Sequence, residues 1–151
     1  MAQFEPFDRA ARRRARDRAA GLIPGREQVL RHVAAELAER RRLLGATPEG
    51  EELWIGLMLP PPGVAGLDPS PRLASGHGGI AGDEDQRHFA DGRFARITAF
   101  MTFHGVNDLP GALLLARRAL VRGGRFQAAF PAGFSLGAVR EGFLEADVAA
   151  G

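Results

Sequence analysis

The hydrophobic positions in the first third of the chain follow helical spacing. Within residues 26–44, apolar side chains recur every three or four positions at Val29, Val33 and Leu37, with charged residues between them. This period predicts an amphipathic helix that packs one face on a core. Residues 8–20 are instead rich in Arg and Ala. Because charge runs are usually exposed, we expect a solvated polar helix there.

Short apolar runs bounded by turn residues predict strands in the rest of the chain. Three consecutive prolines end the first run, and Asp68 ends the second. Residues 74–82 are too rich in glycine for a regular helix, although the end of this segment has room for a short strand. The expected strands are, in chain order, 51–59, 63–68, 78–82, 95–101 and 125–130.

Two further helices alternate with these strands. Asp108 is a suitable N-cap for a helix at 111–121, which Gly123 and Gly124 are expected to end. A final helix is expected at 135–148. Because strands and helices alternate along the chain, we predict an α/β fold with a mostly parallel sheet flanked by helices.

Composition and charge narrow the possible functions. The chain has 151 residues, 45% of them hydrophobic, which is enough for one folded core. Cys is absent and the histidines lack metal-ligand spacing, so we assign no metal site. All 20 basic residues are Arg, but 18 acids reduce the net charge to +2. The pI near 10.7 reflects arginine that never deprotonates, so nucleic acid is not an expected partner.

No segment of the sequence looks like a membrane span or a targeting signal. No apolar run approaches 18 residues. Asp8 and Asp17 flank the Arg-rich run and argue against a transit peptide. We therefore expect a soluble cytoplasmic protein.

Three collinear segments, 7–20, 104–126 and 134–147, carry a family resemblance. Residues 7–20 resemble the Arg-rich helix that opens one branch of the class I S-adenosylmethionine-dependent methyltransferases. Residues 104–126 resemble the stretch HWVNDLPGAL…RRALRPGGRF of that branch, and residues 134–147 resemble its stretch ETLxELRxAxxEAE. The branch they resemble holds the malonyl-carrier-protein methyltransferases of biotin synthesis and the methyltransferase-like proteins of respiratory complex I assembly. The resemblance implies a Rossmann-like domain, S-adenosylmethionine as cofactor, and a small-molecule or carrier-linked methyl acceptor.

The resemblance also implies cofactor-binding roles for five residues, and no catalytic residue. Gly56 corresponds to a remnant of the Gly-rich loop after the first strand, and Asp68 matches the acid that binds the ribose hydroxyls. Asp83, with Glu84 beside it, matches the acid on the adenine side, and His104 falls near the sulfonium or the substrate entrance. Other readings of these residues stay open: a turn Asp before proline, a solvated acidic loop, and a packed histidine at a helix entry.

The chain departs from the family pattern in its first motif. The acid before the glycine loop is missing, and only seven residues separate Ile55 from Gly63. A loop and a helix of three turns need more, so the first cofactor-binding helix is expected to be absent. The family also continues past residue 151 with further strands, so the fold is expected to be incomplete relative to seven strands. The strand at 125–130 then becomes an exposed edge, which favours a homodimer.

These observations predict two regions and leave two functions open. Residues 1–48 form an N-terminal helical region, and residues 49–151 form a partial Rossmann-like methyltransferase domain. The chain is either a methyltransferase with an unknown acceptor or a catalytically inactive binding or assembly module. The sequence does not distinguish the second from a truncated gene product.

Overall fold

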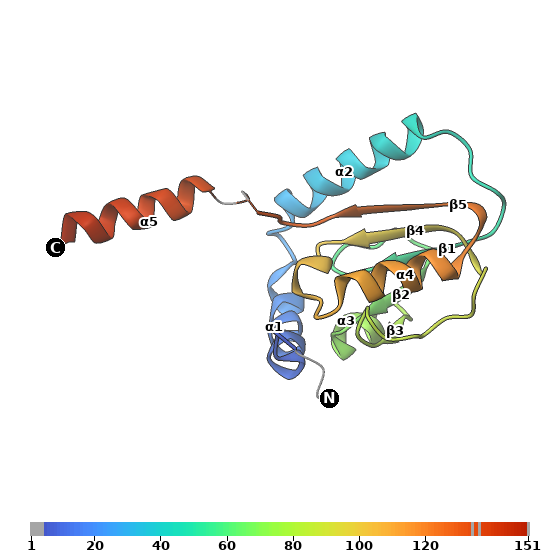
Figure 1. Ribbon diagram of the computed structural model, residues 1–151, viewed down its shortest axis with the longest axis horizontal. Coiled ribbons are helices and arrows are strands. Elements are labelled where there is room, and N and C mark those ends of the chain that lie inside the picture. Colours follow the sequence, from blue (N-terminus) through green and yellow to red (C-terminus); the bar gives the residue numbers. More distant parts are fainter. Residues whose placement is uncertain (1–4, 134, 136, 151) are drawn as a thin grey trace.

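The computed structural model describes residues 5–133, 135 and 137–150 (Figure 1). Leu136, which falls in the predicted final helix, lies outside the described residues. The helices and strands are α1 (Arg9–Leu22), α2 (Gln28–Leu43), β1 (Glu51–Ile55), β2 (Ala65–Asp68), α3 (Pro71–Gly76), β3 (Ile80–Ala81), β4 (Phe94–Phe100), the 3-10 turn η1 (Phe103–Gly105), α4 (Leu109–Ala119), β5 (Leu120–Ala129) and α5 (Gly137–Ala150).

The five strands form one sheet in the order β3-β2-β1-β4-β5. Each pair of neighbouring strands is parallel. The predicted α/β class with a parallel sheet flanked by helices is therefore confirmed, and the sheet of the described residues has five strands. β5 forms one edge of the sheet, as expected from the sequence.

Two apolar clusters lie on opposite faces of the sheet. Alternate strand residues such as Leu53 and Ile97 pack against α4, through Ala112 and Ala116. The intervening positions, Trp54 among them, pack against α2 and α3. Side chains along a strand point alternately to the two faces of the sheet. A layer of helices on each face therefore buries the apolar strand residues of both faces. Figure 1 shows α4 and α2 on either side of the strands.

Several predicted boundaries are wrong, and one helix was not predicted. β1 ends at Ile55, four residues before the predicted end, because a turn follows it. Residues 71–76 form the short helix α3, which Ser70 caps by accepting a hydrogen bond from the Leu73 N–H. α4 ends at Ala119, and Gly123 and Gly124 lie within β5.

The early end of α4 has a tertiary cause. The Gly92 N–H donates to the Arg118 carbonyl and the Arg93 N–H to the Ala119 carbonyl, each at 2.8 Å. These bonds satisfy two of the last helical carbonyls from outside the helix. Residues 92 and 93 lie far from α4 in the sequence, so the local glycine signal misled the prediction.

The connection from β1 to β2 contains no helix. The expected loss of the first cofactor-binding helix is therefore confirmed. Among the described residues, no helix is long and apolar enough to cross a membrane. The division of the chain at residue 48 stays a prediction, although α2 packs directly on the sheet.

Candidate functional site

The carboxyl ends of the parallel strands form the edge at which α/β folds usually bind ligands. In this protein α1 lies against that edge, on the side toward which the arrowheads of β4 and β5 point (Figure 1). Four arginines of α1 face it: Arg9, Arg12, Arg13 and Arg16. Spacings of three and four residues put them on one side of the helix. We call this set the arginine face.

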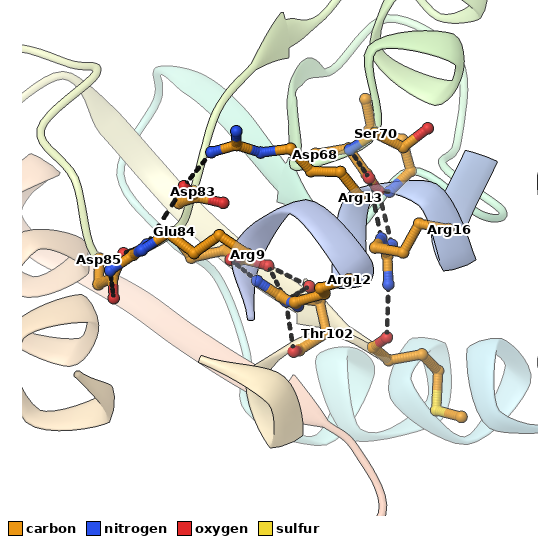
Figure 2. Close-up of polar contacts among 12 residues, drawn as sticks. Arg9, Arg12, Arg13, Arg16, Asp68, Ser70, Asp83, Glu84, Asp85 and Thr102 are labelled. Atoms are coloured by element: carbon orange, nitrogen blue, oxygen red, sulfur yellow. Dashed lines mark hydrogen bonds and ion pairs between the residues drawn. The ribbon is translucent and has the colours of Figure 1, made fainter. Parts of the chain in front are cut away.

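The arginine face corrects the prediction that α1 is solvated. Arg16 is buried, and each arginine of the set pairs with an acid from the strand ends or the loop after β3 (Figure 2). Charge runs are usually exposed because burying charge is costly. Here each guanidinium meets a carboxylate that is itself buried, so the two desolvation costs are offset by pairing.

Asp68, at the end of β2, has a fully buried carboxylate. Its Oδ1 accepts from Arg16 Nε at 2.9 Å and from the Ser70 N–H at 2.8 Å. Its Oδ2 accepts from Arg16 Nη2 at 2.6 Å and from the Leu57 N–H at 2.7 Å. A carboxylate oxygen has about two lone-pair sites, so these four hydrogen bonds saturate Asp68.

Glu84 is held in the same manner by Arg12. Two guanidinium nitrogens of Arg12 donate to Oε1 and Oε2, each at 2.7 Å, and the Thr102 hydroxyl also donates to Oε1. Arg12 further donates to the Thr102 carbonyl at 2.9 Å. Glu84 is thereby tied both to α1 and to the segment that follows β4.

Asp83 and Asp85 complete the acidic set. Asp83 is buried, and its Oδ2 accepts from Arg13, while its Oδ1 has no hydrogen-bond partner among the described residues. Arg9 pairs with both oxygens of Asp85 at 2.7 and 2.9 Å. Burial alone raises the pKa of Asp85, but hydrogen bonds from Arg9 and the Asp108 N–H together hold that pKa below its ordinary value.

Gly56 follows β1 with a φ of 90°. A Cβ at this position would overlap the carbonyl oxygen of Phe100. The glycine is therefore required by the close approach of two strand ends as well as by its positive φ. The space beside Gly56 is filled by the protein's own backbone.

His104 lies in η1 and is exposed. It borders a cavity of about 360 Å³ that is also lined by Arg12, Arg16, Met58, Met101 and Thr102. Partial burial lowers the pKa of His104, and the cations of Arg12 and Arg16 lower it further. The imidazole is therefore held in its neutral form more firmly than in water.

The structure brings the sequence-predicted residues together at one edge. Asp68, Asp83 and Glu84 all contact the arginine face. Gly56 directly precedes Leu57, whose N–H donates to Asp68. His104 borders the neighbouring cavity. Sequence reasoning missed the arginines and Asp85 as members of this site. The spacing of the four arginines was a visible signal, since it marks one helical face.

The cofactor implied by the resemblance does not fit this arrangement. Asp68 has no lone pair left for ribose hydroxyls. The loop after β1 contains Pro60, Pro61 and Pro62, which lack N–H groups, and it leads into no helix. Among the described residues, no group of three or more His, Asp or Glu side chains is arranged to hold a metal ion.

One comparison with solved structures supports the fold. No family model matches the chain, and no curated protein matches it. A solved structure from Haloferax volcanii, the "complex between the Haloferax volcanii Trm112 methyltransferase activator and the putative methyltransferase", superimposes with a TM-score of 0.62 at 22% identity. The match covers 78% of this chain and 59% of that chain. The chain thus has a methyltransferase-like Rossmann fold and spans less than two thirds of that protein.

Proposed function

We propose that this chain is a catalytically inactive, methyltransferase-like module that binds a protein partner. One observation carries the proposal: the carboxylate of Asp68, the ribose-binding position by resemblance, is saturated by hydrogen bonds within the chain. A fold alone does not imply an activity. We therefore give the saturated carboxylate of Asp68 more weight than the methyltransferase-like fold.

We expect α1 to stay in place over the carboxyl edge of the sheet. Releasing Asp68 would leave Arg16 as a buried cation without its partner, and breaking a buried ion pair on one side costs about 3–5 kcal/mol. Arg12 and Glu84 form a second pair of the same kind. A ligand would have to supply the cost of opening both pairs before it gained any affinity.

Calorimetric titration with S-adenosylmethionine and S-adenosylhomocysteine tests this proposal. We expect no saturable heat from a sample whose fold is verified by circular dichroism. A matched titration of Arg16→Gln, which releases Asp68, asks whether opening the edge is sufficient for binding. Saturable binding to the unmodified protein, lost in Asp68→Ala, would overturn the proposal.

A second candidate is an S-adenosylmethionine-dependent methyltransferase that acts on a small or carrier-linked acceptor once α1 moves away. The cavity of about 360 Å³ beside His104 and Met101 favours it, because space remains next to Arg12 and Arg16, which hold the acids. Methyl transfer from a sulfonium depends chiefly on alignment of donor and acceptor, so the missing acid–base pair does not count against it. Binding that is weak in the unmodified protein and stronger in Arg16→Gln would support this candidate.

The proposed partner surface is the free edge of β5, whose only strand neighbour among the described residues is β4. Unpaired edge strands are templates for pairing with another chain. The protein complexed with the Trm112 activator is a precedent for a partner in this fold. A homodimer through this edge and a cytoplasmic location stay predictions, and light scattering after size exclusion would detect the dimer.

A further inference from the structure

The last helix leaves its large apolar side chains in water. α5 follows β5 and points away from the body of the protein (Figure 1). Four large apolar side chains of α5 are between 52% and 83% exposed: Val139, Phe143, Leu144 and Val148. A helix of 14 residues is marginal by itself in water, because helices of this length depend on the packing of an apolar face. α5 therefore needs a surface that covers it.

The apolar side chains of α5 form two stripes. Val139 and Phe143 are four residues apart, which places them on one line along the helix. Leu144 and Val148 form a second line in the same way. At 3.6 residues per turn the two lines are about 140° apart around the helix axis. A helix with this pattern fits a groove with two apolar walls better than a flat surface.

Such a groove lies between α2 and the edge strand β5. Its first part, a cavity of about 540 Å³, is lined by Val29, Val33 and Leu37 of α2 and by the end of β5. Its second part, of about 350 Å³, continues from Leu37 to Leu43 and Leu44. The groove follows α2 for about 22 Å at 1.5 Å per residue, and the 14 residues of α5 span about 21 Å. We call this surface the α2–β5 groove, and its length and its two walls match α5.

The charges of the two surfaces are complementary. Arg140 and Asp147 lie between the two apolar stripes of α5, so they face into a groove that holds both stripes. The α2–β5 groove is lined by two charged side chains of α2, Glu36 and Arg40, which are four residues apart. When α5 runs in the same direction as α2, Arg140 comes beside Glu36, and Asp147 comes beside Arg40. The opposite direction would bring like charges together.

The turn after β5 directs α5 away from the groove of its own chain. The Ala132 N–H donates to Ser135 Oγ at 2.9 Å, and the Ser135 N–H donates back to the Ala132 carbonyl at 2.6 Å. Ser135 itself lines one end of the groove, and α5 begins at Gly137. A return of α5 into its own groove would require this turn to open, whereas the helix of another copy can enter with the turn intact.

We propose that two copies of this chain exchange α5, so that the α5 of each copy occupies the α2–β5 groove of the other. In a two-fold exchange each helix enters the other groove at its Ser135 end, so α5 runs in the same direction as α2. This is the direction that the charges favour. The exchange covers both apolar surfaces and leaves neither to recruit further copies. It does not use the free edge of β5 and does not rest on the partner surface proposed above.

Cysteine cross-linking tests the exchange, because the chain has no Cys of its own. Isotope-labelled Val33→Cys is mixed with unlabelled Val139→Cys and oxidised. We expect a disulfide between a labelled and an unlabelled chain, detected by intact mass. Leu114→Cys, an exposed position on α4 at the opposite face of the sheet, replaces Val33→Cys in the matched control and should give no such link. No mixed disulfide, or a disulfide closed within one chain of a Val33→Cys/Val139→Cys double variant, would overturn the proposal.

The mass of the full chain in solution is an independent readout. Size exclusion with light scattering should show a dimer. Phe143→Asp, at a side chain that is 70% exposed within one copy, should raise the dimer dissociation constant at least about tenfold without unfolding the monomer. Glu145→Gln, on the side of α5 away from both apolar stripes, is the control and should leave that constant unchanged. A monomeric chain, or a dimer that Phe143→Asp leaves intact, as pairing along the edge of β5 predicts, would overturn the exchange.

Discussion

The carboxyl edge under α1 and the charged row under α2, formed by the register partners Glu52, Arg96 and Arg125, both hold a buried arginine, but the two arginines differ in their partners. Arg16 meets the buried carboxylate of Asp68, which also accepts two backbone N–H groups. Arg96 shares one carboxylate with Arg41 and keeps two nitrogens without hydrogen bonds. The Arg16–Asp68 pair is therefore fully hydrogen-bonded, whereas Arg96 has only a distant ion pair with Glu52 at 3.6 Å.

This difference shows that burial of charge alone does not identify a ligand site. The resemblance predicts a cofactor site at the acids of the carboxyl edge, yet Asp68 and Glu84 are held by arginines of α1. The row under α2 matches no motif, yet two donor nitrogens of Arg96 have no hydrogen-bond partner among the described residues. The count of satisfied donors and acceptors is therefore more informative than the type of residue.

The largest expected effect is at Asp68. Asp68→Asn leaves Arg16 buried with a neutral partner, so we expect the free energy of unfolding to fall by about 3–5 kcal/mol. Urea unfolding measures the change. The control is Asp91→Asn, because Asp91 makes only exposed ion pairs with Arg87 and Arg118 and should cost under about 1 kcal/mol. Equal losses at the two positions would contradict the idea of a complete buried site.

A smaller loss is expected at Glu52. Glu52→Gln removes the one carboxylate beside Arg41 and Arg96, so we expect a loss of about 1–3 kcal/mol. Glu51→Gln, at the exposed neighbouring position paired with Arg93, should leave the unfolding curve unchanged within error. Equal unfolding curves for Glu52→Gln and Glu51→Gln would mean that Glu52 does not compensate the charge of Arg96.

The acid dependence of stability is expected to come partly from Asp85. Its folded-state pKa is depressed, so the unfolded chain binds a proton more readily. The stability that Asp85 contributes is present above about pH 4 and is lost as the pH falls through the folded-state pKa. Unfolding free energies of the unmodified protein and Asp85→Asn, measured between pH 7 and pH 2, should converge at low pH. Parallel curves would mean that Arg9 does not hold this carboxylate ionised.

The smallest effect is expected at His104. Nuclear magnetic resonance titration of its ring protons should give a pKa below the ordinary 6.5. Arg12→Gln should raise that pKa, because it removes a nearby cation and frees the charge of Glu84. The exposed Arg14→Gln on the same helix is the control and should leave the titration unchanged. A histidine that responds equally to both substitutions would show that α1 does not lie over this edge in solution.

Local sequence patterns were sufficient for most of the fold. Apart from α3 and η1, the order of helices and strands along the chain and the parallel sheet followed from apolar runs, turn residues and caps such as Asp108, which accepts from the Gly111 N–H. The absence of a helix after β1 followed from the number of residues alone. The end of α4 could not be predicted, because it depends on hydrogen bonds from residues 92 and 93.

The sequence by itself determined which acids follow the predicted strands, since apolar runs and turn chemistry are local properties. Only the tertiary structure decided that these acids are occupied, because Asp68 and Arg16 are 52 positions apart in the chain. The same holds for Arg96, whose shortage of partners appears only when β1, β4, β5 and α2 are assembled. Periodicity fixes which face a side chain is on, but the partners across that face are set by how distant segments pack.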